Sequence, residues 1–246
     1  MADDLERVEL IPPDKIKGFL GSYYPPPVLA PHFVNKKLEE IYSVKRMHII
    51  VNPFAGKKKG KELADLISVD LKESQIEPLL HFTEDMGHAE SIVSLLDFED
   101  GDALMSVGGD GTLSEIITGL LKREDDSSER IPISIIPSGS GNSQANDMDI
   151  VDYLDAINRV SKGHLRKMDV GKVTFMDGEE KKVRYSHNLV GWGLGVDANI
   201  LAEKMRFLGP IRYDLGSLMS IIRGKVRKAK CYIDGNLIDV LKDQFQ

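Results

Sequence analysis

Ser106-Val107-Gly108-Gly109-Asp110-Gly111-Thr112 stands where a strand-like pattern gives way to a helix-like one. The apolar run 103–105 leads into this stretch, and apolar residues follow it at the spacing of a helix with one buried face. These residues are Leu113, Ile116, Ile117, Leu120 and Leu121. The order strand, glycine turn, helix is therefore predicted. Glycines let the backbone approach a large anion and adopt positive φ, and the amides that open a helix can bind phosphate.

Asp110 is the unusual residue of this turn. A carboxylate repels phosphate unless a metal ion or a proton-donating substrate lies between them, and a nucleotide-dependent phosphotransferase supplies both. The alternative is a purely structural turn in which Asp110 caps the start of the following helix.

Length and composition describe an ordinary globular chain. Its 246 residues can form one large or two modest domains, and 41% of them are hydrophobic and 29% charged. No apolar run approaches the roughly 20 residues that cross a bilayer, and residues 1–6 are acidic without the apolar core of a signal peptide. Cys231 is the single cysteine, so neither an internal disulfide nor a cysteine-based metal site is expected. We predict a cytoplasmic protein.

The net charge of −7 is unevenly distributed. Residues 204–230 contain eight Lys or Arg and one acid, which leaves 24 basic and 38 acidic residues elsewhere. A basic segment in an acidic chain suggests an anionic partner such as a nucleotide phosphate or a lipid headgroup, and its alternative is a solvated surface. The overall acidity and the lack of a base-stacking aromatic series argue against nucleic acid as a partner.

Three regions follow one another along the chain. Residues 1–44 contain dense prolines and are interpreted as a leader or surface arm. In residues 45–164 short apolar strand candidates alternate with amphipathic helix candidates, so we expect an α/β nucleotide-binding domain with a mostly parallel sheet. Residues 165–246 contain two hairpin patterns, which predicts a β-rich, sandwich-like lipid-binding domain that is incomplete here.

Three polar or glycine-rich loops follow strands of the predicted sheet, at residues 52–56, 108–112 and 138–142. Loops after parallel strands gather at one edge of a sheet, where ligands bind. The segment 56–62 lacks the spacing and the Ser/Thr of a P-loop, and Gln144 replaces the third glycine of a dinucleotide fingerprint.

Asn52-Pro53, Gly109-Asp110-Gly111-Thr112 and Pro137-Ser138-Gly139-Ser140-Gly141-Asn142, in this order, resemble the diacylglycerol kinase catalytic domain superfamily. The resemblance covers about residues 45–230. The C-terminal matches look most like sphingosine kinases, and they are Trp192-Gly193, Asp197, Glu203-Lys204, Arg206, Leu208-Gly209, Arg212-Tyr213 and Leu215-Gly216.

The resemblance implies an ATP-dependent lipid kinase that phosphorylates a primary hydroxyl of a sphingoid base, with Asp110 as the general base. It implies a nucleotide site that comprises Asn52, Pro53, Phe54, Thr83, Gly108, Gly109, Gly111, Thr112, Glu115, Ser138, Gly139, Ser140, Gly141, Asn142, Arg206 and Arg212. Asp197 and Asn199 would bind the lipid headgroup. Mg²⁺ would arrive with ATP, and no resident protein metal site is expected. The lipid would be met at a membrane surface through peripheral contact, and a homodimer is compatible with this.

Two departures from the family pattern leave the substrate and the activity open. Sphingosine kinases usually carry Asp-x-Asp where this chain has Asp197-Ala198-Asn199, and Asn199 cannot neutralise an amine, so ceramide and diacylglycerol stay open. Family members also continue well beyond this length and return an Asp-Gly-Glu segment to the nucleotide, for which residues 234–236 are a poor substitute. An inactive nucleotide- or lipid-binding regulator therefore stays open, as does an NAD kinase, which shares the Gly-Gly-Asp-Gly turn. His187 lies in a strand pattern and is interpreted as structural.

Overall fold

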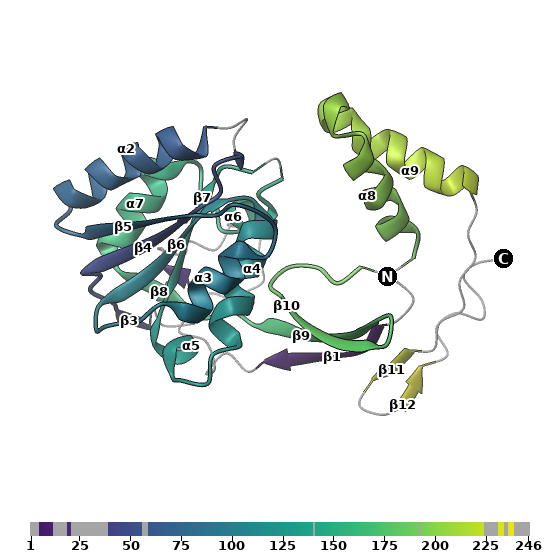
Figure 1. Ribbon diagram of the computed structural model, residues 1–246, viewed down its shortest axis with the longest axis horizontal. Coiled ribbons are helices and arrows are strands. Elements are labelled where there is room, and N and C mark those ends of the chain that lie inside the picture. Colours follow the sequence, from purple (N-terminus) through teal and green to yellow (C-terminus); the bar gives the residue numbers. More distant parts are fainter. Residues whose placement is uncertain are drawn as a thin grey trace, which may run out of the picture. The chain divides into compact units, whose positions relative to one another are not determined.

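The computed structural model describes residues 5–11, 19–20, 39–55, 59–139, 141–191, 193–223, 231–233 and 236–238 (Figure 1). By the contacts within each part, the chain divides into a larger unit, Leu5–Leu189, and a smaller one that comprises Val190–Gln246 with residues 1–4. Each unit is described by itself below. The predicted domain boundary between residues 164 and 165 stays a prediction.

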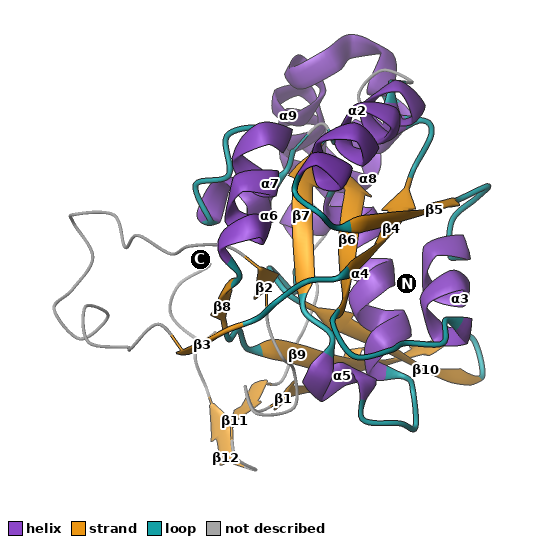
Figure 2. Cartoon of the chain, turned by 90° about the vertical axis from the view of Figure 1, so that its left-hand side faces the viewer, coloured by secondary structure: helices purple, strands orange, loops and turns teal. Residues whose placement is uncertain are grey.

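A parallel sheet forms the centre of the larger unit. Its four parallel strands lie in the order β7 (Ile133–Pro137), β6 (Asp102–Gly108), β4 (Arg46–Val51) and β5 (Glu77–Phe82), as Figure 2 shows. The register pairs Val51 with Val107 and Val107 with Ile136, so neighbouring strands end at the same level. All seven residues of β6 are buried, as expected of a central strand covered on both faces. The mostly parallel α/β fold predicted from the sequence is confirmed.

Helices cover both faces of this sheet (Figures 1 and 2). On one face lie α2 (Gly60–Glu73) and α7 (Tyr153–Lys162), and on the other α3 (His88–Leu95) and α4 (Asp110–Leu121). Two short helices, α5 (Ser127–Arg130) and α6 (Ser143–Asp147), flank β7 in the sequence. The helices α2, α3 and α4 each follow a strand, as the alternating pattern predicts, and α7 follows the short helix α6.

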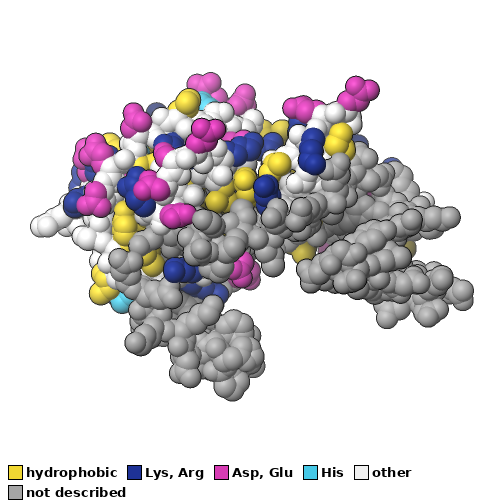
Figure 3. All heavy atoms as spheres, turned by 90° about the horizontal axis from the view of Figure 1, so that it is seen from below, with side chains coloured by type: hydrophobic (Ala, Val, Ile, Leu, Met, Phe, Trp, Pro, Cys, Tyr) yellow, Lys and Arg dark blue, Asp and Glu magenta, His cyan; other side chains and the backbone are white. Residues whose placement is uncertain are grey.

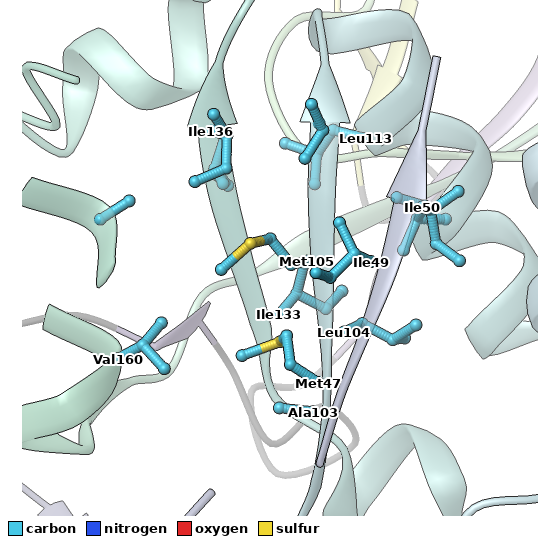
Figure 4. Packing of buried hydrophobic residues seen from close by; sticks show 14 of the residues in the cluster. Met47, Ile49, Ile50, Ala103, Leu104, Met105, Leu113, Ile133, Ile136 and Val160 are labelled. Atoms are coloured by element: carbon cyan, nitrogen blue, oxygen red, sulfur yellow. The ribbon is translucent and has the colours of Figure 1, made fainter. Parts of the chain in front are cut away.

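The core of the larger unit is built from the strands' side chains and the helix faces that pack on them. Met47, Ile49, Met105 and Ile133 are almost completely buried, and Figure 4 shows them between the strands and the surrounding helices. Leu113 and Ile116 of α4 are equally buried, so the helical period read from the sequence marks the face that packs on the sheet. Leu66 of α2, by contrast, is 52% exposed.

Smaller strands extend the parallel sheet beyond β7. The full order is β3-β8-β2-β7-β6-β4-β5, where β2 (Phe19–Leu20) is parallel to β7 and antiparallel to β8 (His164–Arg166), which also pairs with β3 (Glu39–Ile41). The described parts of the leader therefore contribute strands.

A second, antiparallel sheet has the order β1-β9-β10. The hairpin of β9 (Val170–Asp177) and β10 (Glu180–Ser186) turns at Gly178, whose φ of +66° suits glycine. The strand β1 (Leu5–Ile11) pairs with β9, although it lies far from it in sequence. The predicted hairpin is confirmed, and the pairing with the leader is an addition to it.

A charged cluster ties together the strand ends that lie opposite the glycine loops. Arg46, at the start of β4, donates two hydrogen bonds of 2.7 Å to the fully buried Asp102 at the start of β6. Burial would raise the pKa of Asp102, but the hydrogen bonds from Arg46 and from the Glu99 amide outweigh it, so the pKa lies below its usual value. His48 lies 3.2 Å from Asp102 through Nε2 and 3.2 Å from Nε2 of His81 through Nδ1.

The smaller unit is built on a pair of helices, α8 (Leu194–Lys204) and α9 (Arg212–Arg223), joined by the 3₁₀ segment Arg206–Ile211. They cross at small residues. A Cβ at Gly216 would lie 2.5 Å from the Ala198 carbonyl oxygen, so only glycine permits this approach. The two strands β11 (Cys231–Ile233) and β12 (Asn236–Ile238) form the predicted second hairpin.

The surface of the described residues is mixed in character. Figure 3 shows acidic and basic side chains interspersed over the described part of the face seen from below. The outward side of α9 is more apolar, because Leu218, Ile221 and Ile222 are 54%, 61% and 75% exposed. Within the described residues, no helix combines the length and the hydropathy that crossing a membrane requires.

Candidate nucleotide and phosphoryl-transfer site

The carboxyl ends of β4, β5, β6 and β7 bring the predicted loops together at one edge of the sheet. The amide of Asn52 donates to the Val107 carbonyl at 2.9 Å, which extends the ladder between β4 and β6 by one residue. The Thr83 amide similarly donates to Val51 at 2.9 Å, and the Ser138 amide donates to Gly108 at 3.3 Å. The three predicted loops therefore begin next to one another, as the pattern predicts, and the loop after β5 begins beside them.

Two of these loops touch through glycines. A Cβ built on Gly139 would lie 2.4 Å from the Cα of Gly109, and one on Gly109 would lie 3.2 Å from the Cα of Gly139. Neither glycine has positive φ, so the requirement is close approach of two backbones and not an unusual conformation. Gly108 also lacks room for a side chain, because its Cβ would lie 2.4 Å from Oγ1 of Thr112. The loops after β6 and β7 thus pack backbone against backbone.

Asp110 connects the same two loops. Its Oδ2 accepts the amide of Ser143 at 3.0 Å, and its Oδ1 accepts the amide of Gln144 at 3.1 Å. The residue that precedes α4 is Gly109, so Asp110 does not cap its own helix but binds the first amides of α6. The carboxylate is half-buried and is held in one orientation from two sides. Each oxygen keeps a second lone pair with which to accept a proton or hydrogen bond.

The loop after β7 is closed by its own asparagine. The Gly139 amide donates to Oδ1 of Asn142 at 2.7 Å, and Nδ2 of Asn142 donates back to the Gly139 carbonyl at 3.0 Å. Asn142 adopts φ of +54°, which asparagine tolerates better than most residues. Gly141 lies close to Asp110, since its Cβ would be 3.4 Å from Oδ2. Ser140, also predicted for this loop, lies outside the described residues.

Glu115 lies five residues after Asp110 on α4 and binds the turn between β5 and α3. Its Oε1 accepts the Gly87 amide at 2.9 Å and its Oε2 accepts the Ala89 amide at 3.2 Å. Nδ1 of His88 accepts the Glu84 amide at 3.0 Å within the same turn. The predicted nucleotide contact of Glu115 stays a prediction, and the structure adds that both carboxylate oxygens already hold backbone amides of this turn.

The loop after β4 has a different character. The side chain of Asn52 accepts the Phe54 amide at 3.0 Å, which turns the chain after the strand. Phe54 is 65% exposed at this edge, whereas Pro53 is half-buried. A Cβ on Gly60 would lie 2.2 Å from the Asn52 carbonyl oxygen, so the start of α2 packs directly on this loop.

The remaining predicted residues belong to the smaller unit. Asp197 lies in the first turn of α8, and Asn199 is exposed on the same helix. Arg212 is only 6% exposed, and its guanidinium stacks over the ring of Tyr213 and lies 3.9 Å from Glu203. The backbone of Arg206 opens the 3₁₀ segment, and its side chain lies outside the described residues. The roles of these four residues stay predictions.

His187 is a polar group that the sequence does not mark as functional. It lies just beyond β10, and its Nε2 is buried without a hydrogen-bond partner among the described residues. Burial lowers the pKa of His187, and the negative charge of Asp110 opposes this shift without cancelling it. Because the contact of β10 with α4 is long-range, no local signal in the sequence could have marked His187.

The diacylglycerol kinase catalytic domain model matches residues 46–173, which include the four strands and loops of this edge. The chain belongs to this family. The resemblance of the glycine loops to the superfamily is thereby confirmed.

Individual relatives of this diacylglycerol kinase family chain include several lipid kinases. Sphingosine kinase 2 of Arabidopsis thaliana is 31% identical over 192 residues, which cover 75% of this chain and 39% of that protein. Mitochondrial acylglycerol kinase of Xenopus laevis is 28% identical over 207 residues, 78% of this chain and 45% of that protein. The chain thus spans less than half the length of these relatives. A crystal structure of a diacylglycerol kinase from Bacillus anthracis str. Sterne aligns with a TM-score of 0.45 at 25% identity, covering 51% of this chain and 45% of that one.

Proposed function

We propose that this chain carries the nucleotide-binding part of an ATP-dependent lipid kinase. The observation that carries the proposal is the position of Asp110, a carboxylate oriented by the Ser143 and Gln144 amides beside two glycine loops that pack backbone against backbone. Membership of the diacylglycerol kinase catalytic domain family supports an alcohol of a lipid as the acceptor. It also favours a lipid over NAD.

In the proposed reaction the acceptor hydroxyl oxygen attacks the terminal phosphorus of ATP, and the bond from that phosphorus to the bridging oxygen breaks to release ADP. Asp110 takes the hydroxyl proton, a role typically worth about 10²–10⁴ in rate. The backbone of Gly109 and Gly139 leaves room for the phosphates, and Arg206 and Arg212 supply positive charge from the smaller unit. Mg²⁺, when bound with ATP, neutralises part of the phosphate charge that faces Asp110.

We propose that Mg²⁺ binds together with ATP and not at a metal site formed by the protein alone. Within the described residues, no three His, Cys, Asp or Glu side chains gather in a way that could hold a metal ion. Asp110 contributes one carboxylate at the phosphate edge, so a cation there would take most of its ligands from ATP and water, as Mg²⁺ commonly does.

For the acceptor, we propose a sphingoid base, with acylglycerol, diacylglycerol or ceramide as the alternative. Similarity to sphingosine kinases supports the first, and similarity to acylglycerol kinases supports the second. Asn199 is exposed on α8, where a carboxylate would pair with a sphingoid ammonium. Asn199→Asp should therefore raise kcat/KM for sphingosine relative to an acylglycerol about ten- to a hundredfold, the worth of a charge-assisted hydrogen bond. An unchanged ratio would remove Asn199 from the headgroup site.

We also propose that the chain is cytoplasmic and reaches its lipid substrate by peripheral contact with a membrane. The exposed apolar residues of α9, Leu218, Ile221 and Ile222, support contact with acyl chains. Residues 223–230, which begin with the last residue of this helix, contain five Lys or Arg and no acid, a composition that favours anionic membrane surfaces.

Transfer of labelled phosphate from ATP tests the proposal directly. Sphingosine, ceramide, diacylglycerol, monoacylglycerol and NAD are offered in parallel to the wild-type chain and to Asp110→Asn. We expect the wild-type chain to form labelled lipid and Asp110→Asn to form it at least a hundredfold more slowly. ATP and lipid binding without transfer would instead favour a regulator that lacks activity, and labelling of NAD alone would refute a lipid acceptor.

A further inference from the structure

Contacts between β10 and the helices place the end of this strand against the second turn of α4. Arg184 of β10 pairs with Glu90 of α3, which in turn binds Lys122 at the end of α4. One residue further, the Tyr185 carbonyl accepts a hydrogen bond from Oγ of Ser114 at 3.4 Å. Of these two neighbouring residues of β10, Arg184 therefore contacts α3 and Tyr185 contacts α4.

Two residues beyond Tyr185, the chain reaches His187. Ser114 lies one helical turn after Asp110, so the two side chains share one face of α4. The chain that continues past Tyr185 therefore reaches His187 on the side of α4 that carries Asp110. Consistent with this, Asp110 is the charged group that acts on the pKa of His187, where it opposes the larger, lowering effect of burial.

The imidazole of His187 has an unsatisfied atom. Its Nε2 is buried and finds no hydrogen-bond partner in the described part of the chain. Buried polar atoms in folded proteins almost always have a partner, and one left alone is costly. An unsatisfied nitrogen beside the residue that receives the acceptor's proton calls for a ligand group.

We propose that His187 is a specificity-determining residue whose Nε2 hydrogen-bonds an uncharged polar group of the lipid acceptor, a hydroxyl or a carbonyl, next to the hydroxyl that is phosphorylated. The inference rests on the proposed lipid kinase function. A neutral imidazole donates to a carbonyl or accepts from a hydroxyl according to its tautomer.

The acceptor fits this position better than the nucleotide does. The proposed function assigns the phosphates to the glycine loops after β6 and β7, whereas His187 follows β10. Because burial keeps the imidazole neutral near pH 7, His187 offers no positive charge to a phosphate. The alternative is a contact between His187 and the nucleotide, and the test must distinguish it from a contact with the lipid.

Equilibrium binding of the two substrates separates a lipid contact from a nucleotide contact. The probes are ATP with Mg²⁺, and sphingosine and monooleoylglycerol in detergent micelles. His187→Phe should weaken the better-bound lipid about tenfold, the effect of one lost hydrogen bond, and leave ATP affinity unchanged. His187→Gln, which restores a donor and an acceptor, should bind the lipid within about threefold of the wild type. His164→Phe, at a half-buried histidine of β8, is the matched control and should bind both as the wild type does.

Nitrogen NMR of the histidine rings gives a second measurement that does not depend on the variants folding. The Nε2 resonance of His187 should shift on addition of lipid to the wild-type chain and stay unchanged on addition of ATP. Three results would each overturn the inference. They are an unchanged lipid affinity of His187→Phe, an equal loss of affinity for ATP and for lipid in this variant, and an Nε2 resonance that does not shift on addition of lipid. Loss of lipid affinity in His187→Phe without any phosphate transfer by the wild type would support the inference and refute the proposed kinase activity.

Discussion

Replacing Asp110 by asparagine tests the site and the fold together. In the folded chain each carboxylate oxygen accepts one backbone amide, from Ser143 at 3.0 Å and from Gln144 at 3.1 Å. An asparagine side chain of the same shape has one oxygen and one NH₂ group. It can keep one of these hydrogen bonds but must point a donor at the other amide.

The magnitude follows from that mismatch. One hydrogen bond to a charged group is lost, and the Gln144 or Ser143 amide is left facing a donor, at a cost of about 1–3 kcal/mol in unfolding free energy. Asp152→Asn is the matched control. The side chain of Asp152 accepts the Asp155 amide, at 2.9 Å, as the cap of α7. Asparagine caps helices as well as aspartate does, so this variant should lose only a few tenths of a kcal/mol.

Urea denaturation followed by circular dichroism measures the unfolding free energy of both variants, and phosphate transfer with ATP binding measures function. For Asp110→Asn we expect the stability loss above, turnover reduced about 10²–10⁴-fold and ATP affinity within a few-fold of the wild type. Stability equal to that of Asp152→Asn would refute the bridge to α6. Turnover above a tenth of the wild type would refute the role of Asp110 as general base.

Glu115→Gln leaves one of two amides at the start of α3 without an acceptor, so we expect an unfolding free energy lower by about 1–3 kcal/mol, and an unchanged denaturation midpoint would contradict this. Gly139→Ala places a Cβ 2.4 Å from backbone and should cost about 1–3 kcal/mol, whereas Gly111→Ala, with nothing within 4 Å of the new Cβ, should leave the denaturation midpoint unchanged or raised. Burial, and then the neighbouring His48, lower the pKa of His81 in the folded chain. The unfolded chain therefore binds this proton more readily, and the unfolding free energy should fall as pH drops below about 6.5. Urea titrations at a series of pH values should show that the unfolding free energy of His81→Gln falls less steeply with decreasing pH than that of the wild type. Identical slopes would exclude His81 as a source of the pH dependence.

The alternation of strands and helices could be predicted from the sequence because each element carries its own period. Buried strands such as β6 read as continuous apolar runs, and α4 repeats its apolar residues every three or four positions. The pairing of β1 with β9 had no such signal, since it joins residues more than 150 positions apart and depends on register alone. The leader's prolines indicated an arm and gave no information about the strands between them.

The loops of the site could be predicted from the sequence, whereas the hydrogen bonds that connect one loop to another could not. Glycines next to strand ends identify a place where backbones approach closely, and the contact of Gly109 with Gly139 accounts for both of them. The amide partners of Asp110 and Glu115 are supplied by other loops, and nothing near either residue in the sequence encodes them. His187 was interpreted as structural for the same reason, because its neighbourhood is set by the contact of β10 with α4.

The contact of Gly109 with Gly139 also bears on how a ligand is received. Two loops whose backbones touch at van der Waals distance cannot sample separate conformations, and Asp110 fastens them together a second time. Fixing one residue's backbone costs about 1–2 kcal/mol in conformational entropy. For these loops the conformational entropy is lost during folding, when the sheet brings β6 beside β7. It is not lost again each time a nucleotide binds. The edge of the sheet is in this sense preorganised, so its affinity for phosphate should depend little on temperature-driven loop motion.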